Sequence, residues 1–170
     1  ELYNAFLAAK QAGKVGFWGI STHLRAHECL EAAIETGWYD LAMVAITPAG
    51  WYDTVTSTIR SDTGSMKQMK PVLERARAAG IGLVGMKAAR HIALNPYEGL
   101  AATLPATGAS PSMFDEYYNE KLMASGLNPC QRSYAYLLEN GMDVVNSDMQ
   151  NFAHFEENII AARDAHMYVA

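Results

Sequence analysis

Polar side chains that could bind a ligand stand where an apolar run of this sequence ends. The run 14–20 (KVGFWGI) is followed at once by Ser21, Thr22 and His23, which offer two hydroxyls and an imidazole. A buried parallel strand that turns polar at its carboxyl end commonly meets a ligand there. These groups suit hydrogen bonds to an amide or a carbonyl. The alternative is that Ser21 or Thr22 caps the helix expected over residues 25–35.

Lys87 is a second candidate, because it ends the apolar run 81–86 (IGLVGM). An amine in this position could contact an anionic ligand or, with a lowered pKa, form a Schiff base with a carbonyl substrate. A lysine whose stem packs while its ammonium reaches water is the plainer interpretation. The sequence leaves these alternatives open.

The segment 147–158 (SDMQNFAHFEEN) joins the last apolar run to the last helix. Free backbone amides at a helix start can bind a phosphate, although the carboxylate of Asp148 would oppose one. An ordinary strand-to-helix turn, whose acidic residues complement the helix dipole, is the simpler interpretation of this segment.

Other patterns are expected to carry no chemistry. The glycines of 80–85 (GIGLVG) match G-x-G-x-x-G, but they begin a strand, whereas a dinucleotide loop follows a strand and opens a helix. His23 and His27 straddle a loop–helix boundary, which disfavours a metal site. Cys29 and Cys130 are too few for a disulfide framework or a cysteine-only metal site, and they fit a reducing, cytoplasmic setting.

A repeated pattern of helix, glycine and apolar run must position these groups. Helix-like segments end at Gly13, Gly37, Gly80 and Gly141, and an apolar run follows each glycine. Glycine tolerates the left-handed conformation that ends helices, so the next residues are free to extend. Apolar runs without alternation are typical of parallel strands covered on both faces. The sequence therefore predicts an α/β fold with four parallel strands, each followed by a helical region.

Helix starts support this organisation. Ser65 and Gln68 have the spacing of a capping box, and Asn128 is a capping residue before Pro129 at the first helical position.

The two long loops, 47–64 and 88–113, both follow strands. They are expected at the carboxyl-end face of the sheet, where α/β proteins bind ligands. The aromatic pair Trp51 and Tyr52 lies in the first loop and could stack on a ligand there.

Composition narrows the class of protein. The chain has 170 residues, of which 50% are hydrophobic and 18% charged, so it can bury a substantial core as one domain or as part of a larger one. Its formal net charge of −5 argues against nucleic acid or an anionic membrane as the main partner. No apolar run approaches the roughly 18 residues that a bilayer span needs.

Four segments, in this order, resemble the aldo-keto reductase family. They are 14–23 (KVGFWGISTH), 31–46 (EAAIETGWYDLAMVAI), 72–87 (VLERARAAGIGLVGMK) and 149–162 (MQNFAHFEENIIAA). They are similar to that family's fifth strand, its next helix with the sixth strand, its sixth helix with the seventh strand, and its eighth turn with the last helix. The resemblance implies a partial (β/α)8 TIM barrel: a half barrel of four parallel strands with helices.

The resemblance also implies that this half holds much of an NAD or NADP cofactor used for carbonyl reduction. Matching positions place Ser21, Thr22 and His23 at the carboxamide, Met43 on the sixth strand, Lys87 and Ala88 beside the nicotinamide and pyrophosphate, Met149, Gln150 and Asn151 at the adenosine-side phosphate, and Glu157 and Asn158 near the adenine.

Departures from the family pattern bear on the cofactor and on catalysis. Met43 replaces a glutamine that binds the carboxamide, and His154 and Asp148 replace residues that favour the 2′-phosphate of NADP. The family's catalytic Asp, Tyr, Lys and His come from its first four strands, which have no counterpart in this chain.

A half barrel has an open inner face, expected here to be lined by Val15, Phe17, Val44 and Leu83 or their neighbours. Exposing such side chains costs about 1.5–3 kcal/mol each, so we expect a partner, either a second copy or a complementary N-terminal half. A non-catalytic binding or assembly module with the same fold is the alternative to a reductase.

Overall fold

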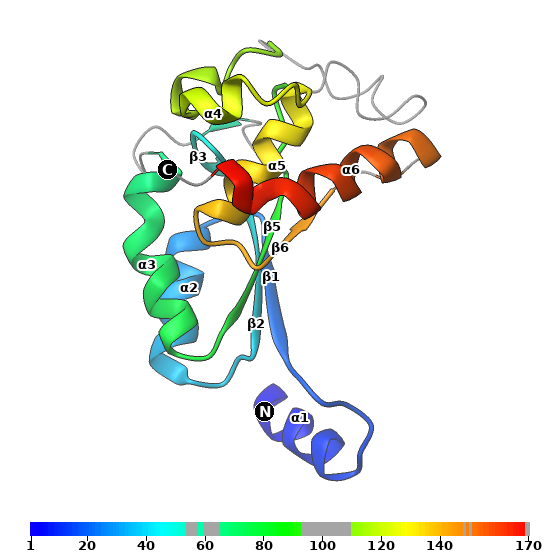
Figure 1. The fold of residues 1–170 in the computed structure, drawn as a ribbon. Helices are drawn as coiled ribbons and strands as arrows, with labels where there is room; N and C mark the ends of the chain where they lie inside the picture. Colours follow the sequence, from blue (N-terminus) through cyan, green and yellow to red (C-terminus); the bar gives the residue numbers. More distant parts are fainter. Residues whose placement is uncertain (54–57, 60–64, 93–109, 148, 150, 169–170) are drawn as a thin grey trace.

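The computed structural model describes residues 1–53, 58–59, 65–92, 110–147, 149 and 151–168. In chain order its elements are α1 (Leu2–Gln11), β1 (Gly19–Thr22), α2 (Ala26–Thr36), β2 (Leu41–Thr47), β3 (Gly50–Asp53), β4 (Thr58–Ile59), α3 (Met66–Ala78), β5 (Gly82–Met86), η3 (Asp115–Tyr117), α4 (Glu120–Met123), α5 (Pro129–Glu139), β6 (Val144–Asn146), α6 (Phe152–Asp164) and η4 (Ala165–Tyr168). Strands and helices alternate along most of the chain, and the predicted α/β class is confirmed (Figure 1).

Four of the strands run in the same direction. β1 pairs with β2, β2 with β5 and β5 with β6, all in parallel. The register places Ser21 beside Met43, Met43 beside Val84, and Val84 beside Val144. Because partners in a parallel pair direct their side chains to the same face, these four side chains form a row across one face of the sheet. We call this row the inner row.

Two further strands come from the segment that the sequence assigns to a loop. β3 pairs antiparallel with the carboxyl end of β2, through Ile46 with Trp51 and Thr47 with Gly50, and β4 pairs antiparallel with β3. The Thr47 hydroxyl donates to the Gly50 carbonyl at 3.1 Å and stabilises the turn. The prediction of a loop over 47–64 is therefore wrong in part, and the sheet is a mixed, open sheet of six strands.

The first strand is shorter than the apolar run that predicts it, because β1 begins only at Gly19. The backbone N–H of Trp18 donates to the Asp40 carboxylate at 2.8 Å, and the Asp40 N–H donates to the Trp18 carbonyl at 2.8 Å. These bonds end the β1–β2 ladder, since β2 itself begins with the residue after Asp40. Val15 and Phe17 therefore lie outside the sheet and not on its inner face.

Helix ends follow the local chemistry of the sequence. The capping boxes of Ser65 with Gln68 and of Asn128 with Gln131 are both formed. The predicted helix-ending glycines all have positive φ angles, which are 69° at Gly13, 61° at Gly37, 81° at Gly80 and 119° at Gly141. These predictions are confirmed because each depends on residues that are neighbours in the chain.

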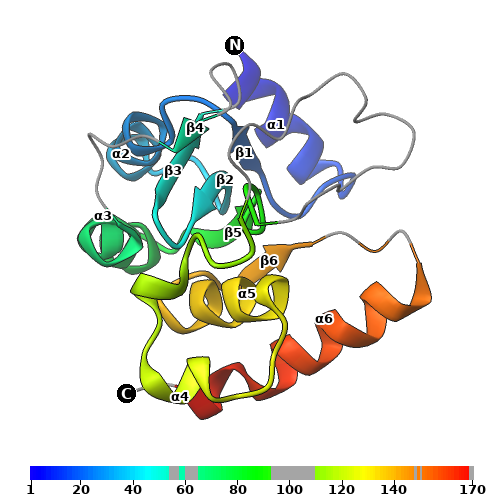
Figure 2. The ribbon, with the colours of Figure 1, turned by 90° about the horizontal axis from the view of Figure 1, so that it is seen from above.

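The core lies between the sheet and the layer formed by α2, α3 and α5 (Figure 2). Val44 and Leu83 are fully buried there, against Leu30 of α2, Leu73 of α3 and Leu137 of α5. Val44 and Leu83 themselves therefore do not line an open inner face, and that part of the expectation is wrong. Strand alternation turns both side chains toward the helices, and it turns the neighbouring Met43 and Val84 to the other face.

Gly85 allows α5 to approach the sheet closely. A Cβ at this position would lie 3.1 Å from Leu137 Cδ2 and 3.2 Å from Met142 Cγ. The G-x-G-x-x-G match at 80–85 thus reflects a helix end and close packing, as predicted.

Helix α1 lies at the amino-terminal end of the sheet (Figure 1). Aromatic rings attach it there. Tyr3 stacks on Trp18 and Trp38, with ring centroids 5.7 and 4.7 Å apart, and Phe6 lies 5.0 Å from Trp18. Tyr39 also lies against Trp18, with ring centroids 4.9 Å apart. None of the α1 side chains is buried, so this aromatic cluster is the helix's main contact with the body of the protein.

Within the described part of the chain, no helix is both long enough and apolar enough to cross a membrane.

Candidate functional site

The candidate site begins at the carboxyl ends of β1 and β2. Ser21 and Met43 are neighbours in the inner row; Ser21 is exposed and Met43 is half-buried. Farther toward the carboxyl ends, Ala45 and Met86 occupy the same face and are buried beneath Tyr52 of β3. A ligand on this face would therefore meet the Ser21 hydroxyl and the Met43 thioether before reaching a closed apolar floor.

His23 and Lys87 lie near each other although they follow different strands. The pKa of His23 is lowered, first by burial of the imidazole and second by the nearby Lys87 ammonium. Both effects disfavour a second positive charge, so the imidazole is predominantly neutral at pH 7 and can either donate or accept a hydrogen bond. The predicted candidates at the ends of the first and third apolar runs are thus near enough for their charges to interact.

The turn that carries Lys87 is held from behind by α5. Lys87 has a left-handed backbone conformation, with φ of 68°. The fully buried Ser133 donates its hydroxyl hydrogen to the Ala88 carbonyl at 2.7 Å, and the Arg90 N–H donates to the Lys87 carbonyl at 2.8 Å. Ala88 is itself buried, so its side chain is not open to a ligand. It would contribute to a site only by shaping this turn.

Arg90 adds a second cation that the sequence patterns do not single out. Its Nε donates to the Tyr52 hydroxyl at 3.3 Å, and its guanidinium lies 5.9 Å from the centre of the Tyr52 ring. The ring of His91 meets the same tyrosine edge-on at 5.5 Å. The only signal in the sequence is the position of Arg90, three residues after Lys87.

The predicted aromatic platform is not available in this structure. Trp51 is 2% exposed and Tyr52 is 3% exposed, so neither ring has an open face on which a ligand could stack. The Tyr52 ring instead closes the apolar floor and positions Arg90.

Thr22 and the start of α2 differ from the expected helix cap. The Thr22 hydroxyl donates to the Leu24 carbonyl and accepts from the Leu24 N–H at 3.2 Å. The N-cap position of α2 is Arg25, in a left-handed conformation and without a side-chain cap. The alternative that Ser21 or Thr22 caps this helix is therefore wrong.

The remaining predicted residues lie around the start of α6, on another part of the fold. Asn151 caps this helix by accepting from the His154 N–H at 2.9 Å, and Met149 before it is 55% exposed. Glu157 and Asn158 are half-buried, and the Glu157 carbonyl accepts from Gln131 Nε2 at 2.9 Å. Two more residues, Asp148 and Gln150, lie outside the described residues.

The charges of the site favour a polar or anionic ligand. In the part of the chain that the structure describes, no carboxylate forms an ion pair with Lys87 or Arg90. Nor does any group of three metal-ligating side chains occur among the described residues. The arrangement offers an ammonium, a guanidinium, a neutral imidazole and a hydroxyl beside an apolar floor.

Comparisons with known proteins found no matching family model, no matching curated protein and no matching solved structure.

Proposed function

We propose that this chain binds a nicotinamide dinucleotide at the carboxyl ends of its parallel strands, as the cofactor-binding half of an aldo-keto-reductase-like carbonyl reductase. The observation that carries the proposal is that His23 and Lys87, which follow directly on β1 and β5, lie near enough for the Lys87 charge to lower the pKa of His23, beyond the strand ends where Ser21 pairs with Met43. The carboxyl edge of parallel strands is the usual ligand-binding edge of α/β proteins.

Each group has a role in this proposal that suits its chemistry. The Ser21 hydroxyl and the neutral His23 imidazole hydrogen-bond to the nicotinamide carboxamide. The Lys87 ammonium, with the guanidinium of Arg90, balances the charge of the pyrophosphate. The adenosine end extends toward the start of α6, where Asn151 and Glu157 lie.

The proposed architecture is a half of a (β/α)8 barrel. It is supported by the consecutive parallel order β1, β2, β5, β6 and by the helices on one face of these strands. The residues that would donate a proton to the carbonyl substrate belong to the complementary strands. The chain by itself is therefore expected to bind cofactor without turnover.

The choice between NAD and NADP depends on the adenosine end. His154, the residue that would meet a 2′-phosphate, is half-buried in the first turn of α6. A half-buried imidazole lacks the fork of donors with which an arginine guanidinium binds a phosphate. We therefore propose that NAD binds at least as tightly as NADP.

The test is a titration of the chain with NADH, followed by nicotinamide fluorescence. We expect saturable binding that Lys87→Met weakens by about tenfold, since a charge-assisted hydrogen bond contributes about 1.5–3 kcal/mol. The matched control is Lys70→Met, which removes an exposed lysine from α3 and should leave the affinity unchanged. Absence of any fluorescence change, or equal losses in both variants, would refute the nucleotide assignment.

The alternative function is a non-catalytic assembly module of the same fold. It is favoured by large apolar side chains that are exposed to solvent, among them Phe17 before β1 and Phe152 on α6. Self-association without a change in nicotinamide fluorescence would support this alternative.

A further inference from the structure

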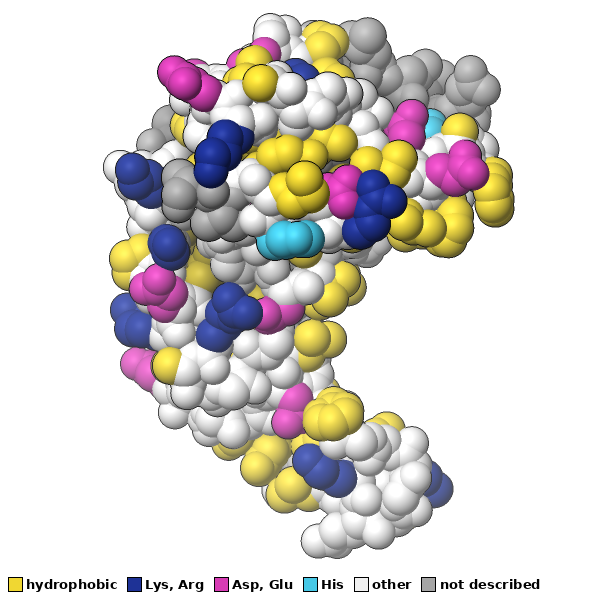
Figure 3. All heavy atoms as spheres, in the orientation of Figure 1, with side chains coloured by type: hydrophobic (Ala, Val, Ile, Leu, Met, Phe, Trp, Pro, Cys, Tyr) yellow, Lys and Arg dark blue, Asp and Glu magenta, His cyan; other side chains and the backbone are white. Residues whose placement is uncertain are grey.

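The short helix η4 packs against α5 through few buried side chains. Of its four residues, Ala165 is buried and Tyr168 is half-buried, whereas His166 and Met167 are exposed. Figure 3 shows apolar side chains at the surface over this part of the fold. A segment with so few buried contacts can open locally while the rest of the protein stays folded. The docking of η4 on α5 is therefore a local equilibrium within the native state.

A hydrogen bond to the start of α4 helps to hold η4 in place. Asn119 Nδ2 donates to the Tyr168 carbonyl at 2.7 Å, and the Asn119 side-chain oxygen accepts from the Leu122 N–H at 2.8 Å as the N-cap of α4. Amide and carbonyl groups do not titrate between about pH 4 and pH 8, so this bond contributes equally to docking across that range.

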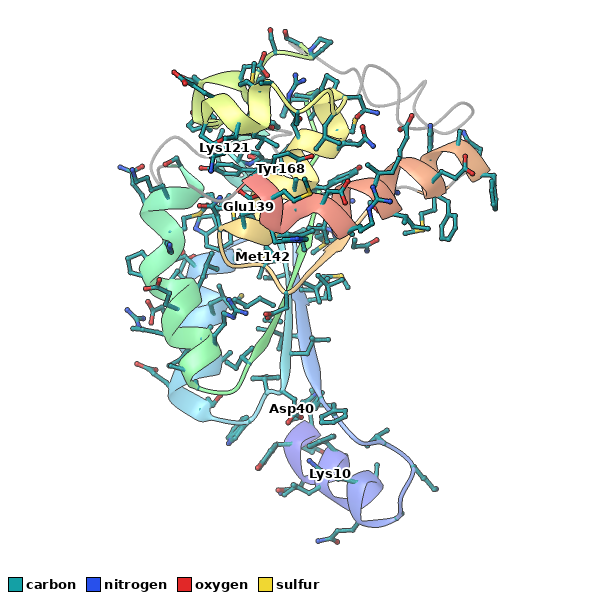
Figure 4. The ribbon with its side chains drawn as sticks, in the orientation of Figure 1. Lys10, Asp40, Lys121, Glu139, Met142 and Tyr168 are labelled. Carbon is teal, nitrogen blue, oxygen red and sulfur yellow. The ribbon has the colours of Figure 1, made fainter. Side chains whose placement is uncertain are left out.

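A carboxyl group lies at the same contact. Glu139, the last residue of α5, lies beside Tyr168, and its Oε1 atom is buried without a hydrogen-bond partner in the described part of the chain (Figure 4). A neutral carboxyl can be buried at modest cost, whereas burial of a carboxylate oxygen that lacks a donor costs far more. The contact between α5 and η4 thus favours the neutral form of Glu139.

Other groups around Glu139 compensate for this burial only in part. Burial raises the pKa of its carboxyl from 4.5 to about 7, while the Tyr168 backbone and the Lys121 ammonium of α4 lower this pKa by less. Asp164, at the end of α6, is ion-paired with Arg163. The neighbouring ends of these elements also carry further titratable groups that do not shift the pKa of Glu139, namely Glu120, Tyr136 and His166.

We propose that Glu139 makes the docking of η4 sensitive to pH: the neutral carboxyl keeps η4 on α5, and loss of its proton to water favours an open state in which the carboxylate is hydrated. The docked state binds the proton more tightly than the open state, in which the pKa of the carboxyl returns toward 4.5. Docking is therefore strongest below pH 4.5 and weakens as the pH rises to about 7.

Millisecond hydrogen–deuterium exchange, read by mass spectrometry of peptides that contain residues 165–168, tests this proposal. Glu139→Gln keeps the shape of the side chain and stays neutral at every pH. A pKa shift from 4.5 to about 7 changes the docking equilibrium by up to about 300-fold, but water reaches part of this carboxyl, so we expect about fivefold. At pH 8 the η4 amides of the unchanged chain should exchange about fivefold faster than those of Glu139→Gln, and at pH 4 the two should exchange equally fast.

Two control variants separate the carboxyl from its surroundings. Glu120→Gln neutralises an exposed carboxylate of α4 and should leave the exchange of η4 unchanged at both pH values. Asn119→Ala removes the donor to Tyr168 and should speed the exchange of η4 by the same factor at both pH values.

Equal exchange of η4 in the unchanged chain and in Glu139→Gln at pH 8 would overturn the proposal. So would a difference of the same size at pH 4. Exchange of the η4 amides no faster than that of the α3 amides would overturn it as well, because opening of η4 would then require global unfolding.

Glu139 is not among the groups proposed to bind the nucleotide. A pH-dependent η4 in a chain that leaves NADH fluorescence unchanged would support the proposed docking and refute the proposed function. A chain that binds NADH but has a pH-independent η4 would do the opposite.

Discussion

Replacing Ser133 by alanine tests whether α5 fixes the Lys87 turn. The Ser133 hydroxyl is fully buried and donates to the Ala88 carbonyl at 2.7 Å, in the turn that holds Lys87 in its left-handed conformation. Ser133→Ala removes the donor and leaves a buried carbonyl without it. The cost of such an unsatisfied acceptor is about 1–3 kcal/mol of unfolding free energy.

The same substitution should also affect the site. With the Ala88 carbonyl released, the turn can leave a conformation that a non-glycine residue adopts only when its surroundings impose it. The Lys87 ammonium would then be less well positioned, and we expect NADH affinity to fall at least threefold, or about 0.7 kcal/mol.

Urea unfolding followed by circular dichroism measures the first effect, and fluorescence titration with NADH measures the second. Ser125→Ala is the matched control, because the Ser125 hydroxyl donates to the Leu122 carbonyl at 2.6 Å in the loop before α5, away from the site. It should lower stability without lowering the affinity for NADH. If Ser133→Ala left both stability and affinity unchanged, or if the two variants lost affinity equally, α5 would not be what positions Lys87.

Two further predictions concern stability alone. Glu139 of α5 lies beside Tyr168 of η4, and burial raises the pKa of this carboxyl from 4.5 to about 7 (Figure 4). The Glu139 carboxyl therefore binds its proton more tightly in the native state than in the unfolded chain. The stabilisation that this tighter proton binding gives to the native state is complete below pH 4.5 and is lost as the pH rises to about 7. Glu139→Gln should raise the free energy of unfolding at pH 8 by about 1 kcal/mol, a value that already allows for solvent screening, and should change it little at pH 4. Thermal melts at both pH values measure this difference. An equal effect at the two pH values would contradict the prediction. Gly85→Val should lower the free energy of unfolding, measured in urea, by about 1–3 kcal/mol, because the added side chain meets Leu137 and Met142. The control is Gly16→Val, where a Cβ meets no atom within 4 Å, and it should lower the free energy of unfolding far less. Equal losses in the two variants would contradict the packing argument.

Several features of the fold could be predicted from short stretches of sequence. The capping boxes at Ser65 and Asn128 and the helix-ending glycines involve residues within a few positions of one another. The α/β class follows from the alternation of helical and apolar segments. In all these cases the relevant interactions are local, so the amino-acid types at those positions determine them.

The predictions that the structure corrects depend instead on residues that are distant in the chain. The length of β1 depends on Asp40, whose backbone and carboxylate bind Trp18 and end the ladder. The hairpin of β3 and β4 depends on pairing with the end of β2. Uniformly apolar strands carry no alternation, so the sequence could not show that Val44 faces the helices while Met43 faces the other side.

For the candidate site too, some features follow from the sequence and others only from the tertiary structure. The sequence by itself determined the types of its groups: a hydroxyl at Ser21, an imidazole at His23 and an amine at Lys87, each at the end of an apolar run. Only the tertiary structure decided that the imidazole lies near the amine, and that Arg90 binds the Tyr52 hydroxyl. The physical reason is that strand order and register bring together residues distant in the chain, and these depend on packing across the whole sheet rather than on any local pattern.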